Sequence, residues 1–164
     1  MNYIIFIIFL ALGIVFRIIP HAPNFTPMLS IALLSGYYIK NRFSILLPIA
    51  IMLISDIMLG GNPMSYWVYA SIVLIILLGY FIKNNPKNII VNSLISSILF
   101  FLITNLGVWF MGGYSYSIYG LIECYILAIP FFKNTLISTT FFSMFIYSLH
   151  YLIKSTLIKY QETI

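Results

Sequence analysis

Long apolar runs separated by short polar breaks follow one another along the whole chain. The apolar runs cover residues 3–19, 27–39, 43–59, 66–82, 88–111 and 134–153. None of them shows the strict apolar and polar alternation of a membrane-barrel strand, so we expect α-helices, which satisfy their own backbone groups in lipid. The expected fold is all-α, a polytopic membrane protein in which residues 1–164 form a single domain with six transmembrane helices.

The segment between the fifth and sixth runs interrupts this pattern. Residues 117–132 are apolar, but the run is short and ends close to Pro130 and Lys133. A proline is unfavourable inside a helix. We therefore expect residues 115–132 to form a loop with a short helix that enters the membrane only partly, before the last helix at residues 134–153.

Composition agrees with a membrane protein. Hydrophobic residues make up 62% of the chain and charged residues 7%, with a mean hydropathy of +1.07. A soluble domain carries about 25% charged residues. The expected surroundings are therefore the lipid bilayer.

The net charge of +5 at pH 7 is explained by topology and requires no nucleic-acid partner. Basic residues are enriched in the cytoplasmic loops of membrane proteins. With six spans, two basic residues, Arg17 and Lys133, lie opposite the termini, and six lie on the side of the termini: Lys40, Arg42, Lys83, Lys87, Lys154 and Lys159. We therefore expect both termini in the cytoplasm.

Three prolines and several polar residues gather in the stretch PHAPNFTP, residues 20–27. The apolar run that follows it is short and rises only about 20 Å, so its beginning is expected below the outer membrane surface. Thr26 and Pro27 predict a helix N-cap and first turn, whereas Pro20 and Pro23 favour extended backbone before it. Irregular backbone at this depth is tolerated where it is buried in protein or lines a watery cavity, as in transporter binding sites.

Charged and polar residues on three other runs are predicted to lie at one depth. A helical rise of about 1.5 Å per residue places Arg17, Asp56 and Asn105 roughly 21, 20 and 24 Å above the cytoplasmic edge. A carboxylate at this depth costs on the order of 2.5 to 3.5 kcal/mol without a cavity or a partner, so Arg17 is the expected partner of Asp56. Alternatively, Arg17 snorkels to the outer headgroups. A pair between the two residues can support the fold alone or bind a substrate.

Other candidate residues also have ordinary structural interpretations. Asn105 can bond to a neighbouring helix. Trp109 and Tyr114 fit the aromatic belt at a membrane interface as well as a role in stacking on a ligand. Cys124 is interpreted first as a small apolar residue, with ligation of the cobalt of a corrinoid as the alternative.

Several motifs together resemble a family of small, uncharacterised bacterial integral membrane proteins. The motifs are Arg17 followed by PHAPNFTP, Ser55-Asp56 with Gly60, TNLGVW at 104–109, and GLIECYILAIPFF at 120–132. In arrangement that family is similar to the substrate-capture subunits, or S components, of energy-coupling-factor (ECF) vitamin transporters.

The resemblance implies an S-component-like bundle in the bacterial cytoplasmic (inner) membrane. Its first, third and fifth loops, residues 21–26, 60–65 and 112–132, would lie over a ligand held near the outer face. The resemblance also implies an ECF-type transmembrane subunit and ATPases as partners, with a chain that transports alone as the other possibility.

The expected function is a substrate-binding subunit for uptake of a small vitamin-like molecule, without enzymatic activity and without a cofactor. Arg17 and His21 would meet anionic groups of the ligand, and an acidic side chain such as Asp56 would accept from its donors. The expected binding residues are Arg17, His21, Asn24, Thr26, Asp56, Asn62, Asn105, Trp109, Tyr114 and Glu123.

Two other classes of function remain open at this point. A structural membrane protein of envelope assembly would use the polar layer only to join its helices. An intramembrane metal-dependent enzyme would need ligands such as His21, Asp56, Glu123 and Cys124, but these residues show no paired metal-ligand spacing.

Overall fold

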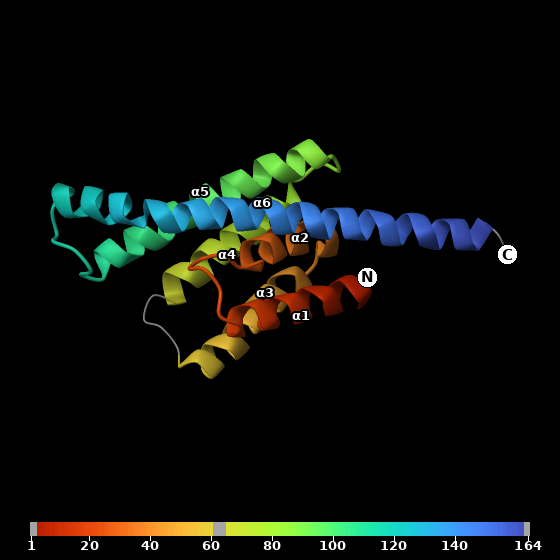
Figure 1. Cartoon of the computed structure of the whole chain (residues 1–164), viewed down its shortest axis with the longest axis horizontal. Helices are drawn as coiled ribbons and strands as arrows, with labels where there is room; N and C mark the ends of the chain where they lie inside the picture. Colours follow the sequence, from red (N-terminus) through yellow and green to blue (C-terminus); the bar gives the residue numbers. More distant parts are fainter. Residues whose placement is uncertain (1–2, 61–64, 163–164) are drawn as a thin grey trace.

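Six α-helices, each antiparallel to the one before it, form the described part of the chain in a computed structural model (Figure 1). The structure describes residues 3–60 and 65–162, and no strand occurs among them, which confirms the all-α prediction. The helices are α1 (Tyr3–Ile18), α2 (Met28–Ile39), α3 (Phe43–Leu59), α4 (Ser65–Tyr80), α5 (Pro86–Phe110) and α6 (Ile118–Glu162).

Two helices have the length and hydropathy of membrane-spanning helices. They are α5, with 25 residues, and the 39-residue part Ile118–Thr156 of α6. The other four helices are apolar but have 16, 12, 17 and 16 residues, from α1 to α4. Helices of this length rise about 18 to 26 Å, less than a hydrocarbon core of about 30 Å. Helix length therefore supports two membrane-spanning helices and does not confirm the expected six.

The main correction to the predicted fold concerns residues 115–132. They do not form a separate, partly inserted loop, because from Ile118 onward they belong to the 45-residue helix α6. Pro130 lies inside this helix, where a proline costs on the order of 3 kcal/mol. Packing against α5 opposes that cost, and Tyr125 Oη donates a hydrogen bond to the Leu102 carbonyl at 2.7 Å. Continuous helix also leaves few backbone groups unpaired in this segment.

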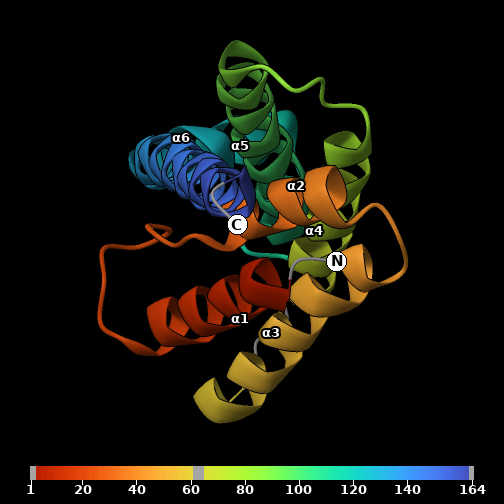
Figure 2. The same cartoon turned by 90° about the vertical axis from the view of Figure 1, so that its right-hand side faces the viewer.

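Helix α2 lies in the middle of the bundle. Figure 2 shows it between the pair α1 and α3 and the pair α5 and α6. Its residues 28–36 are all buried, which suits a helix that is apolar on every side. Two of its serines bond to neighbouring helices: Ser30 Oγ donates to the Thr139 carbonyl and Ser35 Oγ to the Ser44 carbonyl, both at 2.8 Å.

The interior contains small polar side chains, whereas much of the outer surface is apolar. The buried polar side chains in the described ranges are all serine or threonine. On the outside, Ile57, Phe81 and Phe110 are 81%, 83% and 62% exposed. A large exposed apolar surface marks a contact with a membrane or a partner, and small polar residues are typical of helix contacts within membranes. The distribution favours surroundings of lipid.

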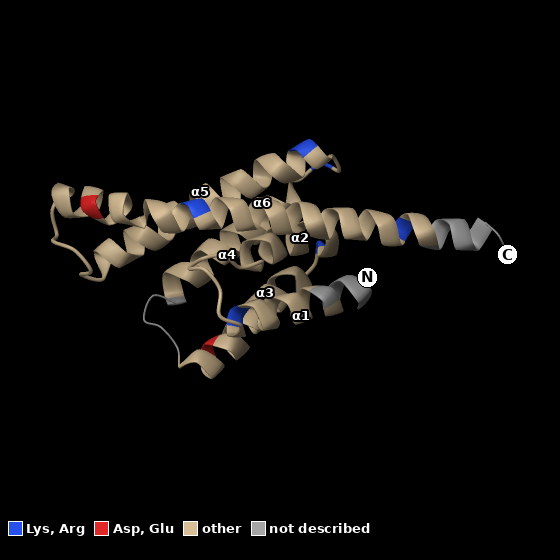
Figure 3. Ribbon diagram, viewed as in Figure 1, with Lys and Arg blue, Asp and Glu red and all other residues tan. Residues whose placement is uncertain are grey.

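Both termini lie at the same end of the bundle (Figure 1). Figure 3 shows basic positions at the start of α5 and in the second half of α6 at this end. The positions coloured as acidic, on α3 and in the first half of α6, lie toward the opposite end. The charge distribution that the sequence suggests along one axis is therefore present in the folded chain.

Candidate functional site

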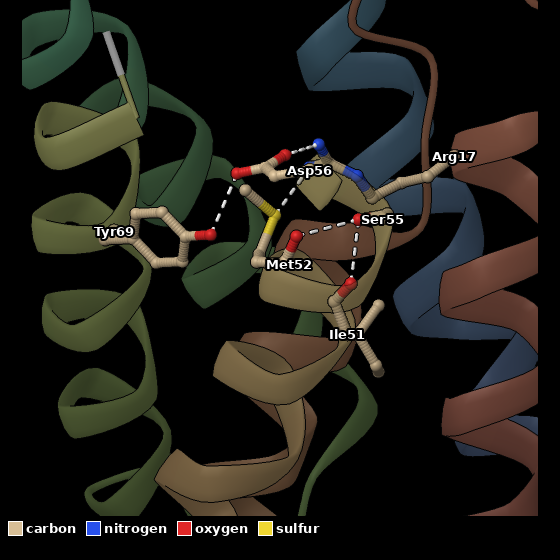
Figure 4. Close-up of polar contacts among 6 residues, drawn as sticks. All are labelled: Arg17, Ile51, Met52, Ser55, Asp56 and Tyr69. Atoms are coloured by element: carbon tan, nitrogen blue, oxygen red, sulfur yellow. Dashed lines mark hydrogen bonds and ion pairs between the residues drawn. The ribbon is translucent and has the colours of Figure 1, made fainter. Parts of the chain in front are cut away.

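A group of polar side chains joins α1, α3 and α4 (Figure 4). Arg17, in the last turn of α1, forms an ion pair from Nη2 to Oδ1 of Asp56, in the last turn of α3. Its Nη1 donates toward the sulfur of Met52, one turn earlier on α3. Tyr69, on α4, donates from Oη to Asp56 Oδ2 at 2.8 Å. The predicted pairing of Arg17 with Asp56 is confirmed.

Both charged side chains of this pair are largely removed from solvent. The side chains of Arg17 and Asp56 are 19% and 16% exposed. Arg17 Nε is buried and has no hydrogen-bond partner in the part of the chain that the structure describes. A guanidinium group has five N–H donors. Arg17 therefore holds Asp56 and still has a donor for an additional acceptor.

A cavity of about 280 Å³ opens beside Arg17. It brings together four of the residues predicted to bind a ligand, namely Arg17, His21, Asn24 and Thr26. The other lining residues are mainly apolar and include Met28, Leu29, Ile72 and Phe100. The cavity therefore offers both hydrogen-bonding groups and apolar contact.

The backbone of the PHAPNFTP stretch is a hydrogen-bonded turn, which corrects the expected extended conformation. Phe25 N donates to the Ala22 carbonyl at 2.9 Å, with Pro23 and Asn24 between them. Asn24 has a φ of 62°. Proline followed by a residue with positive φ is typical of a type II turn, and asparagine adopts that conformation at less cost than most residues. Asn24 is thereby directed to the cavity wall.

The start of α2 also differs from the prediction. Helix α2 begins at Met28, the N-cap position is Pro27, and no side chain bonds to the first turn. Thr26 is therefore not the N-cap. Because the turn at residues 22–25 closes just before it, Thr26 lies between turn and helix and lines the cavity instead.

Two bonds to α6 hold this turn in place. Asn134 Nδ2 donates to the Pro23 carbonyl at 3.0 Å, and Ser138 Oγ donates to the Asn24 carbonyl at 3.3 Å. The turn thus connects the α1 side of the bundle to α6. These partners lie more than one hundred residues away along the chain.

A second cavity of about 320 Å³ adjoins the first, because Asn24, Val68 and Phe100 line both. Asn105 lies on its wall, and its Nδ2 donates to the Phe101 carbonyl in its own helix at 2.7 Å. The expectation that Asn105 bonds to a neighbouring helix is therefore not met by this contact. The rest of the wall is mainly apolar and aromatic, with Phe101, Val108, Ala128, Phe131 and Phe132.

Two predicted residues lie at the connection between α5 and α6, outside both cavities. Trp109 Nε1 donates to the Ser115 carbonyl at 3.0 Å and the Trp109 ring contacts Tyr116, so the tryptophan closes this connection. Tyr114 lies within the connection and is half-buried. Their positions at one end of the bundle fit the aromatic-belt interpretation.

Two further predicted residues, Glu123 and Cys124, line neither cavity. Glu123 is exposed on α6. Cys124 is 2% exposed, and its Sγ donates toward the Asn105 carbonyl at 3.4 Å, so it packs α6 on α5. Asn62 lies outside the described residues.

The sequence reasoning missed Tyr69, which fixes the carboxylate of Asp56. A tyrosine near the start of an apolar helix also fits the interfacial belt, so its type and position alone did not identify it. In the described ranges, no three His, Cys, Asp or Glu side chains lie close enough to hold a metal ion.

The model of a family of unknown function (DUF6580) matches residues 1–161. No curated protein and no solved structure matches the chain. A function for this chain therefore has to be inferred from the geometry of the site.

Proposed function

We propose that this chain, which belongs to the DUF6580 family, is a membrane protein that binds a small vitamin-like molecule for uptake. The observation that carries the proposal is the pair of adjoining cavities, the first lined by Arg17 and the second lined mainly by apolar and aromatic side chains. Ligand sites are typically concave and mostly apolar, with a few polar groups that orient the ligand. Binding here involves no chemical change.

The polar cavity suits an anionic or acceptor group of the ligand. Arg17 Nε has a buried N–H without a partner among the described residues. His21 lines the same cavity, and its Nδ1 donates to the Ile19 carbonyl at 2.6 Å. Its Nε2 can then donate to an anionic group of the ligand when the ring is protonated, and accepts a hydrogen bond when the ring is neutral. Charge-assisted hydrogen bonds to a carboxylate or phosphate are about twice as strong as neutral ones.

The second cavity suits a ring or an apolar chain. The Phe101 and Phe132 rings lie 4.5 Å apart between centroids and form part of its wall. Thr104 and Asn105 add polar groups that can orient a ring substituent. A molecule with an acidic end and a ring therefore matches both cavities.

In the proposed arrangement, all six helices lie in the bacterial cytoplasmic membrane with both termini in the cytoplasm. The shorter helices pack around α2. The turn at residues 22–25 is proposed to lie below the outer membrane surface. The cavities then open on the outer half of the bundle. An ECF-type transmembrane subunit with ATPases is the proposed energising partner, on the strength of the sequence resemblance.

Topology gives a direct test of this arrangement. Alkaline phosphatase fused after Ile164 should be inactive, and the same enzyme inserted between Gly112 and Gly113 should be active. In the proposed arrangement α6 crosses the membrane once between these two positions, so they lie on opposite sides. A fluorescent protein that matures only in the cytoplasm should give the opposite pattern. Active phosphatase at the C-terminus would contradict the proposed orientation.

Ligand retention tests the binding function. Protein purified in mild detergent should release a small molecule on denaturation, detected by mass spectrometry. His21→Ala should reduce the retained amount about tenfold or more, because a hydrogen bond to a charged group contributes on the order of 1.5 to 3 kcal/mol. The amount of small molecule that stays bound after the purified protein is diluted measures this loss.

Lys133→Gln is the matched control, because Lys133 is an exposed basic residue of α6 that lines neither cavity. It should retain the wild-type amount. Equal losses in both variants, or no retained molecule in the wild type grown in rich medium, would contradict binding at this site.

A further inference from the structure

A third cavity, of about 590 Å³, lies at the end of the bundle near the termini. Its wall is formed by the end of α2, the connection between α4 and α5, and the second half of α6. It shares no lining residue with the two cavities near Arg17. This cavity is therefore separate from the two near Arg17.

The amide of Asn84 is held in one orientation at this cavity. Tyr37 Oη donates to Asn84 Oδ1 at 2.7 Å, and Tyr147 Oη donates to the same oxygen at 3.0 Å. The two hydroxyls come from α2 and α6, so they join these helices through the loop residue. Since the carbonyl side of the amide is used by two donors, its nitrogen carries two N–H donors in the other direction, at the cavity wall.

Tyr38 adds a second hydrogen-bonding group. Its hydroxyl oxygen is buried and has no partner within the ranges that the structure describes. The Tyr38 ring lies 4.4 Å from the His150 ring between centroids, and both residues line the cavity. A buried hydroxyl without a partner costs on the order of 1 to 3 kcal/mol, and an acceptor bound in the cavity would remove that cost.

The charges at this cavity are positive. Lys40 and Lys154 line it, and both are exposed. Among the described residues that line it, none is acidic. The positions drawn as acidic on α3 and in the first half of α6 lie toward the opposite end of the bundle (Figure 3). The two lysines therefore meet an incoming anion without a competing carboxylate on the wall.

We infer that this cavity binds the phosphate group of an anionic phospholipid. Lysine, tyrosine hydroxyl and amide N–H groups are all donors to phosphate oxygens. Basic pockets between helices on the cytoplasmic side are sites for anionic headgroups, and tyrosines prefer the headgroup level. The phosphate chemistry follows from the cavity itself, and the choice of a lipid as its source rests on the membrane placement proposed above.

The inference is tested on the full chain in detergent by native mass spectrometry and thermal unfolding. Phosphatidylglycerol and cardiolipin should bind to the wild type and raise its unfolding temperature, and phosphatidylcholine should not. Lys40→Gln with Lys154→Gln should weaken binding of phosphatidylglycerol about 25-fold, since each basic residue contributes a factor of about five. Tyr38→Phe, which removes only the hydroxyl, should weaken it less.

Lys87→Gln is the control, because Lys87 is exposed at the same end of the bundle and does not line the cavity. It should bind phosphatidylglycerol as the wild type does. Inorganic phosphate is tested in the same way. If it stabilises the wild type but not the double variant, and the lipids stabilise neither, the cavity binds phosphate from a soluble molecule instead of a lipid. Equal losses in Lys87→Gln and the double variant, or no preference for anionic over zwitterionic lipid together with no effect of phosphate, would overturn it. The double variant should lose lipid binding and still retain the small molecule bound at the Arg17 cavities. The lipid site and the proposed uptake function can therefore fail independently.

Discussion

Replacing Gly36 by leucine is expected to prevent the chain from forming this bundle, and Gly79→Leu should have the same effect. A Cβ atom added at Gly36 would lie 2.1 Å from the Ile76 carbonyl oxygen, and one added at Gly79 would lie 2.2 Å from the Leu33 carbonyl oxygen. These are backbone atoms, so no side-chain rotation relieves the contact. Helices α2 and α4, which carry these glycines, would have to separate.

The position of α2 makes this separation costly. Helix α2 packs against α3, α4, α5 and α6, so moving it away from α4 disturbs the contacts of several helices. Overpacking in an interior usually costs about 1 to 3 kcal/mol when side chains can shift. Close approach of helices through small residues is a main source of stability within membranes. We expect even Gly36→Ala to lower the free energy of unfolding by more than about 3 kcal/mol.

The measurement is the yield of monodisperse protein in detergent and the temperature of its thermal unfolding. Gly13→Ala is the matched control, because its Cβ would meet side-chain atoms and no backbone atom among its three nearest neighbours: Cδ1 and Cγ2 of Ile51 at 2.8 Å and Cδ1 of Ile31 at 3.3 Å. It should be purified normally with a small decrease in unfolding temperature. An unchanged unfolding temperature in Gly36→Ala would show that α2 and α4 are not in backbone contact.

The second large effect concerns the ion pair. Arg17→Met alone and Asp56→Leu alone should each lower the free energy of unfolding by about 2 to 3 kcal/mol. Removing one partner leaves a charge in a largely buried place, and the loss is below the roughly 3 to 5 kcal/mol of a fully buried pair because both side chains are partly exposed. The double variant should recover most of this loss, since apolar residues often replace an ion pair without cost.

Tyr69 requires a further substitution in this experiment. In Asp56→Leu, the Tyr69 hydroxyl loses the carboxylate oxygen to which it donates. Adding Tyr69→Phe to the double variant removes that donor and should restore stability further. A triple variant less stable than either single variant would contradict the pairwise account of this group.

The same variants separate a structural role from a ligand-binding role. If Arg17 binds the ligand, the stable double variant should lose the retained small molecule, whereas it should keep normal unfolding behaviour. A stable double variant with undiminished retention and uptake would assign the pair to the fold alone. Retention and stability are therefore measured on the same preparations.

The sequence by itself was sufficient for the first five helices, for part of the sixth and for one long-range contact. Residues 43–59 were expected to form a helix and form α3, and residues 27–39 were expected where α2 covers Met28–Ile39. Apolar runs and their breaks are local features, so they are visible along the chain. Matching depth and opposite charge were enough to pair Arg17 with Asp56, because a carboxylate in such surroundings needs a partner.

The tertiary structure decided the features that depend on segments far apart in the chain. Residues 115–132 continue into α6 because α5 supplies a packing partner along them, although Pro130 locally favours an interruption. The turn at Asn24 is held by Ser138 of α6, which no local pattern indicates.

The cavities and the backbone contact of α2 with α4 also depend on segments that are far apart in the chain. Gly36 and Gly79 read along the sequence as ordinary glycines in apolar helices, and only their approach to the carbonyl groups of the facing helix shows why a side chain is excluded. Likewise, Tyr37, Asn84 and Tyr147 come from three separate segments and share one hydrogen-bonded group only after the helices have packed. Packing between helices is set by shapes and distances in space, which the order of residues along a single chain does not display.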